Sequence, residues 1–313
     1  MRRRRLGSQG PEMSAIGFGA WEAGGGSEWG QAPPEEQILE AIEAIFDCGI
    51  DWIDTAEVYG NGRSEELVAK AVGGRRDEIL ILSKVAPSPE GWGFRPDQVR
   101  SACEKSLRRL QTDRLDLYQL HWPDDTRVPL EDTWGAMASL VDDGLVRHIG
   151  VSNFDRGLIE RCEAIRHVDS LQQEFSMLQQ RDRDLIRWCG EQGTGVLSYG
   201  PLAFGLLTGA IRAETAFDEG DFRADEESDA LFGSGLERSL AVVERLRPIA
   251  ERLDISLAQL ALAWNVHQSG VSVAIAGSRN PKHVRSNAAA GDVELDEAIR
   301  SELDAVVSET APT

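Results

Sequence analysis

The sequence is poor in cysteine and in long apolar runs, and it carries no excess of positive charge. Its four cysteines are scattered and form no C-x-x-C pair, which is typical of free thiols in a reducing compartment and favours a cytoplasmic location. No apolar run approaches the roughly 18 residues that a membrane-spanning helix needs. No apolar segment follows the N-terminal arginines, so no signal peptide is expected. The formal net charge of −20 argues against nucleic acid and anionic membranes as partners.

Two kinds of functional site are also missing. No G-x-G-x-x-G motif follows a predicted strand, so a dinucleotide bound as in a Rossmann domain is not expected. No Ser-His-Asp arrangement stands out. The histidines lie too far apart in sequence for metal-ligand spacing, so no metal site is predicted; they are His121, His148, His167, His267 and His283.

The sequence does contain a regular alternation of short apolar runs with amphipathic stretches. Helices are predicted over 35–49, 95–111, 131–144 and 295–308. Strands are predicted over 15–19, 51–55, 79–85, 115–122, 146–152, 170–175, 195–200 and 271–277. Strands that alternate with helices form parallel sheets, and a chain of this length fits a closed (β/α)8 TIM barrel better than an open sheet. Because no linker divides the chain, we expect residues 1–313 to form a single α/β domain.

Reactive side chains gather where these predicted strands end. In a (β/α)8 barrel the active site lies at the C-terminal ends of the strands. The residues placed there are Asp54, Tyr59, Lys84, His121, Ser152, Asn153, Gln172, Glu174 and Tyr199. Each one alone has an ordinary structural explanation, such as a helix cap, a solvated lysine or a core histidine. Their convergence on one end of the barrel favours a catalytic site instead.

Four of these residues could together form a proton donor. The pKa of a phenol is about 10, and a neighbouring ammonium group lowers it. Lys84 could supply that charge to Tyr59, and Asp54 could hold Lys84 in place. His121 could orient a substrate carbonyl or relay the proton.

Two loops at the same end could complete a pocket. The acidic segment 203–235 follows the seventh strand and lacks a regular pattern, which favours a functional loop over an unstructured insertion. The segment 87–96 follows the third strand and could supply a lid. Trp21, Trp92 and Trp122 are predicted to wall a substrate pocket, although Trp92 could instead close its own loop.

From about residue 4 to about residue 290 the chain resembles the aldo-keto reductase superfamily. The resemblance is carried by GIDWIDTAEVYG (49–60), LQTDRLDLYQLHWPD (110–124), HIGVSNF (148–154), YGPLAFGLLTG (199–209) and GSRNPKHVRSN (277–287). It implies an N-terminal β-hairpin before the barrel and a long loop after the seventh strand. It also implies a catalytic tetrad of Asp54, Tyr59, Lys84 and His121, with Tyr59 as the proton donor.

The resemblance further implies a nicotinamide cofactor. Its carboxamide would meet Ser152, Asn153 and Gln172, and its ring would stack on Tyr199. The backbone of Gly19, Ala20 and Trp21 would approach the same end, and Gly200, Pro201 and Leu202 would cover the pyrophosphate. The adenosine end would meet Gly277, Ser278, Arg279, His283 and Asn287.

The implied cofactor is NADP, with NADPH favoured over NADH. Arg279 could pair with a ribose 2′-phosphate, or it could form an ordinary surface ion pair at the start of a helix. Many relatives carry lysine where this chain has Gly277, and the absence of that lysine weakens the case for strict use of NADP.

These observations together predict NADPH-dependent reduction of a small aldehyde or ketone. One alternative is an NAD(P)-dependent dehydrogenase that oxidises a sugar or polyol. Another is a cofactor-sensing binding subunit with little turnover. These alternatives stay open because the loop 203–235 and the short C-terminal tail resemble both the bacterial sugar or aryl-aldehyde reductases and the potassium-channel β-subunits.

Overall fold

The fold is a closed barrel of parallel strands, as the sequence predicts. The structure is a computed structural model that describes residues 1–25, 29–87, 93–124, 128–224 and 231–308. The strand order around the barrel is β10-β3-β4-β5-β6-β7-β8-β9. The strands are β3 (Ile16–Gly19), β4 (Trp52–Asp54), β5 (Leu80–Val85), β6 (Leu115–Leu120), β7 (Val146–Ser152), β8 (Ser170–Glu174), β9 (Gly195–Tyr199) and β10 (Val271–Gly277).

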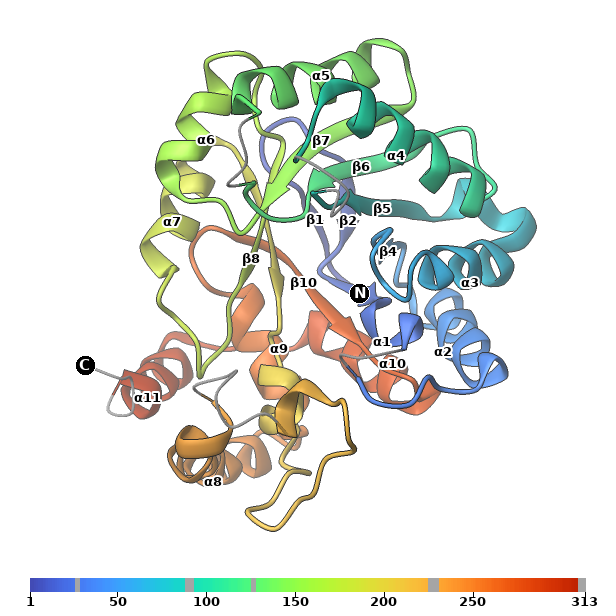
Figure 1. Cartoon of the computed structure of the whole chain (residues 1–313). Helices are drawn as coiled ribbons and strands as arrows, with labels where there is room; N and C mark the ends of the chain where they lie inside the picture. The colour runs from blue at the N-terminus through green and yellow to red at the C-terminus, as the bar shows by residue number, and fades with distance from the viewer. Residues whose placement is uncertain (26–28, 88–92, 125–127, 225–230, 309–313) are drawn as a thin grey trace.

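Helices surround the strands and cover their outer faces (Figure 1). The helices that connect successive barrel strands are α2 (Glu35–Cys48), α3 (Arg63–Val72), α4 (Pro96–Arg109), α5 (Leu130–Asp142), α6 (Arg156–Glu163) and α7 (Arg183–Gln192). Helices α8 (Leu236–Arg252) and α9 (Leu257–Val266) both lie between β9 and β10, whereas α10 (Pro281–Ala289) and α11 (Glu297–Ser308) follow β10. A short helix, α1 (Trp21–Gly24), directly follows β3.

An N-terminal hairpin closes the end of the barrel at which the strands begin. Its antiparallel strands are β1 (Arg3–Arg5) and β2 (Glu12–Ser14). Leu6 and Met13 pack in one cluster with inward-facing barrel residues such as Trp52. The Trp52 ring fills the space beside Gly17, where a Cβ atom would lie 2.0 Å from it, so this position requires glycine. The hairpin therefore completes the interior core and leaves only the opposite end of the barrel for a site.

The alternation of side chains along each strand aims the candidate residues inward. Successive side chains of a strand point to opposite faces. Trp52, Leu82 and Leu197 belong to the interior cluster. The residues two positions further along their strands are Asp54, Lys84 and Tyr199, so these share the inward face.

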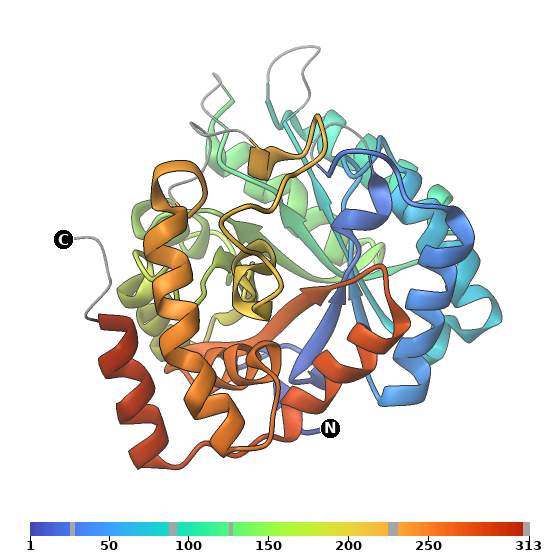
Figure 2. The same cartoon turned by 90° about the horizontal axis from the view of Figure 1, so that it is seen from below.

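The long segment after β9 is more ordered than an unpatterned loop. It contains the 3-10 turns η2 (Ala203–Thr208), η3 (Phe222–Ala224) and η4 (Gly233–Gly235). Asp221 forms a β-bridge with Trp29. Residues 203–224 (yellow to orange) accordingly pass beside the first blue helix, α1, in Figure 2. This segment thus bridges the barrel mouth from β9 to the region after β3.

The cysteines and helices of the described residues bear on disulfides and membrane spans. All four cysteines are free. Burial raises the pKa of Cys103, Cys162 and Cys189 to about 12, so these thiols are protonated at neutral pH. None of the described helices is long and apolar enough to cross a membrane. The described residues also contain no group of three potential metal ligands.

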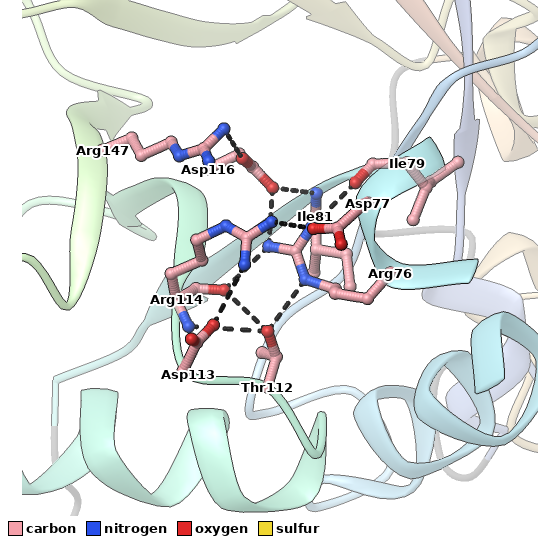
Figure 3. Close-up of polar contacts among 9 residues, drawn as sticks. All are labelled: Arg76, Asp77, Ile79, Ile81, Thr112, Asp113, Arg114, Asp116 and Arg147. Atoms are coloured by element: carbon pink, nitrogen blue, oxygen red, sulfur yellow. Dashed lines mark hydrogen bonds and ion pairs between the residues drawn. The ribbon is translucent and has the colours of Figure 1, made fainter. Parts of the chain in front are cut away.

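A network of arginines around one buried carboxylate ties the N-terminal ends of three strands together (Figure 3). Oδ2 of Asp116 on β6 accepts hydrogen bonds from the Ile81 amide of β5 at 2.9 Å and from Arg76 at 2.8 Å. Oδ1 of Asp116 accepts one from Arg147 of β7 at 3.0 Å. Arg76 also donates to the carbonyl oxygens of Ile79 and Arg114. Because Asp116 is 2% exposed, its charge depends on these partners.

We predict that Asp116→Asn lowers the free energy of unfolding by about 2–4 kcal/mol, because it removes the charge that the arginines surround and turns an amide donor toward other donors. Denaturant unfolding measured by circular dichroism checks this value. Asp113→Asn is the matched control, since Asp113 is exposed and pairs only with Arg114 among the described residues; its change should stay within about 0.5 kcal/mol. Equal losses for both variants would show that the buried network adds no stability.

Candidate active site

The four predicted tetrad residues meet inside the barrel at the C-terminal ends of the strands. Nζ of Lys84 lies 2.6 Å from Oδ1 of Asp54 and 3.3 Å from the hydroxyl of Tyr59, and it also donates to the Thr55 carbonyl oxygen at 3.0 Å. The Tyr59 hydroxyl lies 3.5 Å from Nε2 of His121, a long contact. Lys84 is fully buried and Asp54 is 3% exposed. The phenol therefore lies between a buried ammonium group and an imidazole.

The pKa of Lys84 reflects two opposing effects. Burial lowers the pKa of this lysine, while Asp54 acts to raise it. A buried ammonium without a counter-charge would lose its proton. Asp54 is thus the group that allows Lys84 to keep a positive charge beside Tyr59.

Glycines let the Tyr59 loop pack against α1. A Cβ atom on Gly24 would lie 2.6 Å from the Tyr59 carbonyl carbon, and one on Gly60 would lie 2.3 Å from the Gly24 carbonyl oxygen. Gly60 also has a φ of +59°, which favours glycine. Arg63 secures the same contact by donating to the carbonyl oxygens of Ala23 and Gly24. The sequence YGNGR thus fixes the loop that carries the phenol.

His121 directly follows β6 and is held as a neutral imidazole. Burial, and to a smaller extent the Lys84 charge, holds the pKa of His121 well below its usual range. Its Nδ1 atom has no hydrogen-bond partner among the described residues. The Asn153 amide donates to the His121 carbonyl oxygen at 3.3 Å and so fixes the backbone at this position. The imidazole can therefore exchange a hydrogen bond at Nε2 without carrying a charge.

The residues predicted for a carboxamide lie next to the tetrad. Nε2 of Gln172 donates to Oδ2 of Asp54 at 2.9 Å. The Tyr199 hydroxyl donates to Oδ1 of Asn153 at 2.9 Å, and Asn153 Nδ2 donates to the Ser152 hydroxyl at 3.2 Å. Burial raises the pKa of Tyr199, so its phenol is neutral. The uncharged ring is available for stacking. Asn153 adopts a φ of +59°, a left-handed conformation that turns its side chain back toward β9.

The first residues after β3 border the same space. Gly19 pairs with Asp54 across the β3–β4 ladder. The Ala20 amide donates to the Asp54 carbonyl oxygen at 2.8 Å, and the Ser64 hydroxyl donates to the Ala20 carbonyl oxygen. On the β9 side, Gly200 has a φ of +63° and opens a turn through Pro201 and Leu202 into η2.

The residues predicted for the adenosine end lie at the junction of β10 and α10. Gly277 ends β10, and the Ser278 hydroxyl accepts a hydrogen bond from the Asn280 amide at the start of α10. His283 is exposed on α10 and Asn287 is buried. Nε of Arg279 lies 3.2 Å from Oε2 of Glu22 on α1. The ion pair that was the alternative for Arg279 is therefore present.

Aromatic side chains form one wall of the barrel mouth. Trp21 stacks on Phe222 of the long loop with 5.8 Å between ring centroids. It also contacts Trp29 edge-on at 5.0 Å and lies 6.2 Å from the Tyr59 ring. Trp122 is 39% exposed, and its ring lies 4.6 Å from that of His121. Trp92, the third predicted pocket residue, and residues 88–92 of the predicted lid lie outside the described residues.

Comparison with known proteins gives this arrangement a family. A sequence model of the Aldo/keto reductase family matches residues 15–308. The chain belongs to this family. The aldo-keto reductase YhdN of Bacillus subtilis (strain 168) is 36% identical over 281 residues, which cover 87% of this chain and 83% of that protein.

Solved structures of other aldo-keto reductases share the whole fold. The glycerol dehydrogenase AKR11B4 from Gluconobacter oxydans superposes with a TM-score of 0.88 at 28% identity, covering 99% of this chain and 96% of that one. An aldo-keto reductase from Klebsiella pneumoniae, solved in complex with NADPH, has a TM-score of 0.77 at 32% identity over 100% of this chain and 96% of that one. The chain is thus an oxidoreductase of the aldo-keto reductase family.

Several residues around the site of this aldo-keto reductase were not predicted from the sequence. Gln119, two positions before His121, lies on the inward face of β6 and contacts Gln172. Its position in the period-two pattern of β6 was the available signal. Glu22 lies in the four-residue helix α1 and Phe222 in the three-residue turn η3, and both elements are too short to show a periodic pattern. Trp29 lies outside any helix or named strand.

We predict that the His121 imidazole stays neutral at pH values where an ordinary histidine is already protonated, because burial depresses its pKa. An unfolded histidine takes up a proton near pH 6.5, so His121 makes the unfolded state bind more protons and lowers stability as the pH falls below that value. Nitrogen-15 NMR of the imidazole in the folded protein checks the prediction. The urea-unfolded protein serves as the control that should titrate normally; a folded-state midpoint at or above 6.5 would contradict this environment.

Proposed function

We propose that this aldo-keto reductase reduces an aldehyde or ketone to an alcohol with NADPH, and that Tyr59 donates the proton. The observation that carries the proposal is the position of the Tyr59 hydroxyl, 3.3 Å from Lys84 Nζ and 3.5 Å from His121 Nε2. When bound, the cofactor supplies hydride to the carbonyl carbon. The Tyr59 hydroxyl gives its proton to the carbonyl oxygen as negative charge develops there.

Lys84 makes Tyr59 a better proton donor through its charge. An ammonium group beside a phenol favours the phenolate that remains after proton transfer. Asp54 keeps Lys84 charged and fixed in the apolar barrel interior. The neutral His121 can donate a hydrogen bond from Nε2 to the substrate oxygen, which orients the carbonyl between the two groups.

The neutral amides and the Tyr199 ring fit a nicotinamide. A carboxamide offers two N–H donors and one acceptor, which match side-chain oxygens and amides such as those of Ser152, Asn153 and Gln172. The hydrogen bond from Tyr199 to Asn153 fixes the orientation of the Tyr199 ring, and the nicotinamide ring can stack on its face. The buried ends of β7, β8 and β9 would thus hold the nicotinamide beside Tyr59.

The β10–α10 junction supports NADPH over NADH. Arg279 precedes the N-terminus of α10, where backbone amides and the helix dipole favour an anion. A guanidinium group can pair with a ribose 2′-phosphate there. Glu22 opposes this preference, since it competes for Arg279 and adds a negative charge. The Klebsiella relative solved with NADPH also favours the phosphorylated cofactor.

The reverse reaction is the second candidate, and one specific observation favours it. The relative with the TM-score of 0.88 is a glycerol dehydrogenase. An exposed Trp122 and an aromatic wall at Trp21 could accommodate a small polyol as well as an aldehyde. In that direction Tyr59 would start as the phenolate, which the Lys84 charge favours, and would accept the hydroxyl proton rather than give it.

A spectrophotometric assay separates the candidates. Purified protein is mixed with NADPH or NADH and aryl aldehydes, short aldehydes, methylglyoxal or aldoses, and separately with NADP or NAD and glycerol or other polyols. Rapid oxidation of NADPH by one class of carbonyl supports the reductase. Faster formation of reduced cofactor from a polyol supports the dehydrogenase. Tight cofactor binding without turnover in either direction would favour a cofactor-sensing subunit instead.

We predict that Tyr59→Phe lowers kcat by about 10²- to 10⁴-fold and leaves the Kd for NADPH nearly unchanged, because only the proton donor is lost. Steady-state kinetics and fluorescence titration measure the two quantities. The matched control is Tyr118→Phe, which removes a phenol hydroxyl from the outer face of β6 and should keep the wild-type kcat. Turnover by Tyr59→Phe at the wild-type rate would exclude Tyr59 as the proton donor.

We also predict that Arg279→Leu raises the Kd for NADPH about ten- to a hundredfold while changing that for NADH by less than about twofold, since the two cofactors differ only in the 2′-phosphate. Fluorescence titration with each cofactor measures both constants. Arg285→Leu is the control, because Arg285 lies on α10 itself, near Arg279 in sequence, but pairs with Asp47 on α2. Equal effects of Arg279→Leu on the two cofactors would contradict the proposed pairing of Arg279 with the 2′-phosphate.

A further inference from the structure

A chain of hydrogen bonds crosses the barrel interior below the proposed nicotinamide site. Gln119 of β6 is fully buried. Its Nε2 lies 3.2 Å from the Ser170 hydroxyl and 3.4 Å from the Val151 carbonyl oxygen, and its Oε1 accepts from Gln172 Nε2 at 3.2 Å. Gln172 Nε2 also donates to Oδ2 of Asp54 at 2.9 Å. The chain thus runs from β7 and β8 through two amides to the carboxylate that anchors Lys84.

The chemistry of the two ends fixes the direction of this chain. A carbonyl oxygen and a carboxylate can only accept hydrogen bonds. Gln119 must therefore turn its NH2 group toward Val151, and Gln172 must turn its NH2 group toward Asp54. The oxygen of Gln119 then faces a donor of Gln172, so both assignments agree with each other. Reversing either amide would set two acceptors or two donors against each other.

A glycine makes the crossing possible. Gly150 of β7 pairs with Gln119 on one side and with Ser170 on the other. A Cβ atom at Gly150 would lie 2.1 Å from the Ser170 hydroxyl oxygen. The absence of a side chain on this inward position leaves room for Gln119 to reach past β7 to Ser170. The glycine of the HIGVSNF stretch therefore serves the amide chain.

The chain of hydrogen bonds leaves the side-chain oxygen of Gln172, Oε1, available as an acceptor. Both N–H groups of its amide are used, by Asp54 and by Gln119. Oε1 of Gln172 accepts no hydrogen bond from any residue within the described ranges. The amide therefore presents a fixed acceptor, which suits the NH2 group of a carboxamide.

We propose that Gln119 is a positioning residue for cofactor binding: it fixes the amide orientation of Gln172 so that Oε1 faces the nicotinamide carboxamide. The inference rests on the proposed NADPH-dependent function, and it goes beyond it by assigning a role to a residue buried beneath the site. Gln119 acts only through Gln172 and touches neither the cofactor nor the substrate.

In this role Gln119 affects only the binding of the nicotinamide end of the cofactor. NADPH and NADH carry the same carboxamide, so losing Gln119 should weaken both by the same factor. Adenosine 2′,5′-bisphosphate has no nicotinamide and should bind as before. A general loss of structure would weaken all three ligands instead.

The test is Gln119→Met, which nearly keeps the side-chain volume and removes the amide. Isothermal titration with NADPH, NADH and adenosine 2′,5′-bisphosphate gives three values of Kd. We expect the first two to rise about five- to tenfold, the loss of one well-placed hydrogen bond, and the third to stay within about twofold. The KM for NADPH should rise with its Kd while kcat stays near wild-type, because Asp54 still holds Lys84.

Gln173→Met is the matched control. Gln173 is the next residue of β8 and is also buried, but its amide points the other way and donates to Asp182 at 2.8 Å. This variant should bind all three ligands like the wild type. Where Gln119→Met does not fold, Gln119→Asn replaces it, because its shorter side chain draws the amide away from Gln172 while keeping a polar group in the barrel.

The outcomes separate this inference from the proposed function. Wild-type protein that binds neither NADPH nor NADH would overturn the function and the inference together. Wild-type binding with unchanged constants in the Gln119 variant would overturn only the role of Gln119. Weakening of adenosine 2′,5′-bisphosphate by the same factor as NADPH would also overturn it, since the effect would then be a general one.

Discussion

The buried ion pair between Lys84 and Asp54 is the constraint on which the rest of the site depends. An ammonium group inside a barrel is tolerated only with a counter-charge and with its remaining donors satisfied. Asp54 and the Thr55 carbonyl oxygen meet that need. The second oxygen of Asp54 then requires its own donor, which Gln172 supplies, and Gln172 in turn is oriented by Gln119. One buried charge thus dictates polar residues on four strands.

The barrel separates this charged region from the parts that hold the fold together. At the N-terminal ends of β5, β6 and β7, Asp116 gathers its arginines on the outer face. The β1–β2 hairpin seals the interior from below with Leu6 and Met13. Because these contacts lie at the end opposite Tyr59, the loops at the barrel mouth can vary without loss of the core. This division explains how one fold carries different substrate pockets.

The sequence was sufficient for the fold and for the gathering of Asp54, Tyr59, Lys84 and His121 at one end of the barrel. The fold follows from regular patterns, whereas the grouping of these four residues rested on the strand ends and on the family resemblance. Strand alternation places Asp54, Lys84 and Tyr199 on the inward face, and the strand ends place them at one mouth. The partner of Arg279 was not predictable, since Glu22 lies at the other end of the chain and only the closure of β10 on β3 brings them together. The ordered contacts of Phe222 depend likewise on side chains from irregular segments.

The two ends of the proposed cofactor site use different physical means of recognition. The nicotinamide end consists of neutral amides inside the barrel, where orientation matters and salt has little effect. The phosphate end lies at the rim, where Arg279 and Glu22 are partly exposed and their interaction is screened by ions. Under the proposed function, substitutions at the rim would therefore shift preference between NADPH and NADH without disturbing Lys84 or Tyr59. The choice of cofactor would then be physically independent of the proposed proton transfer.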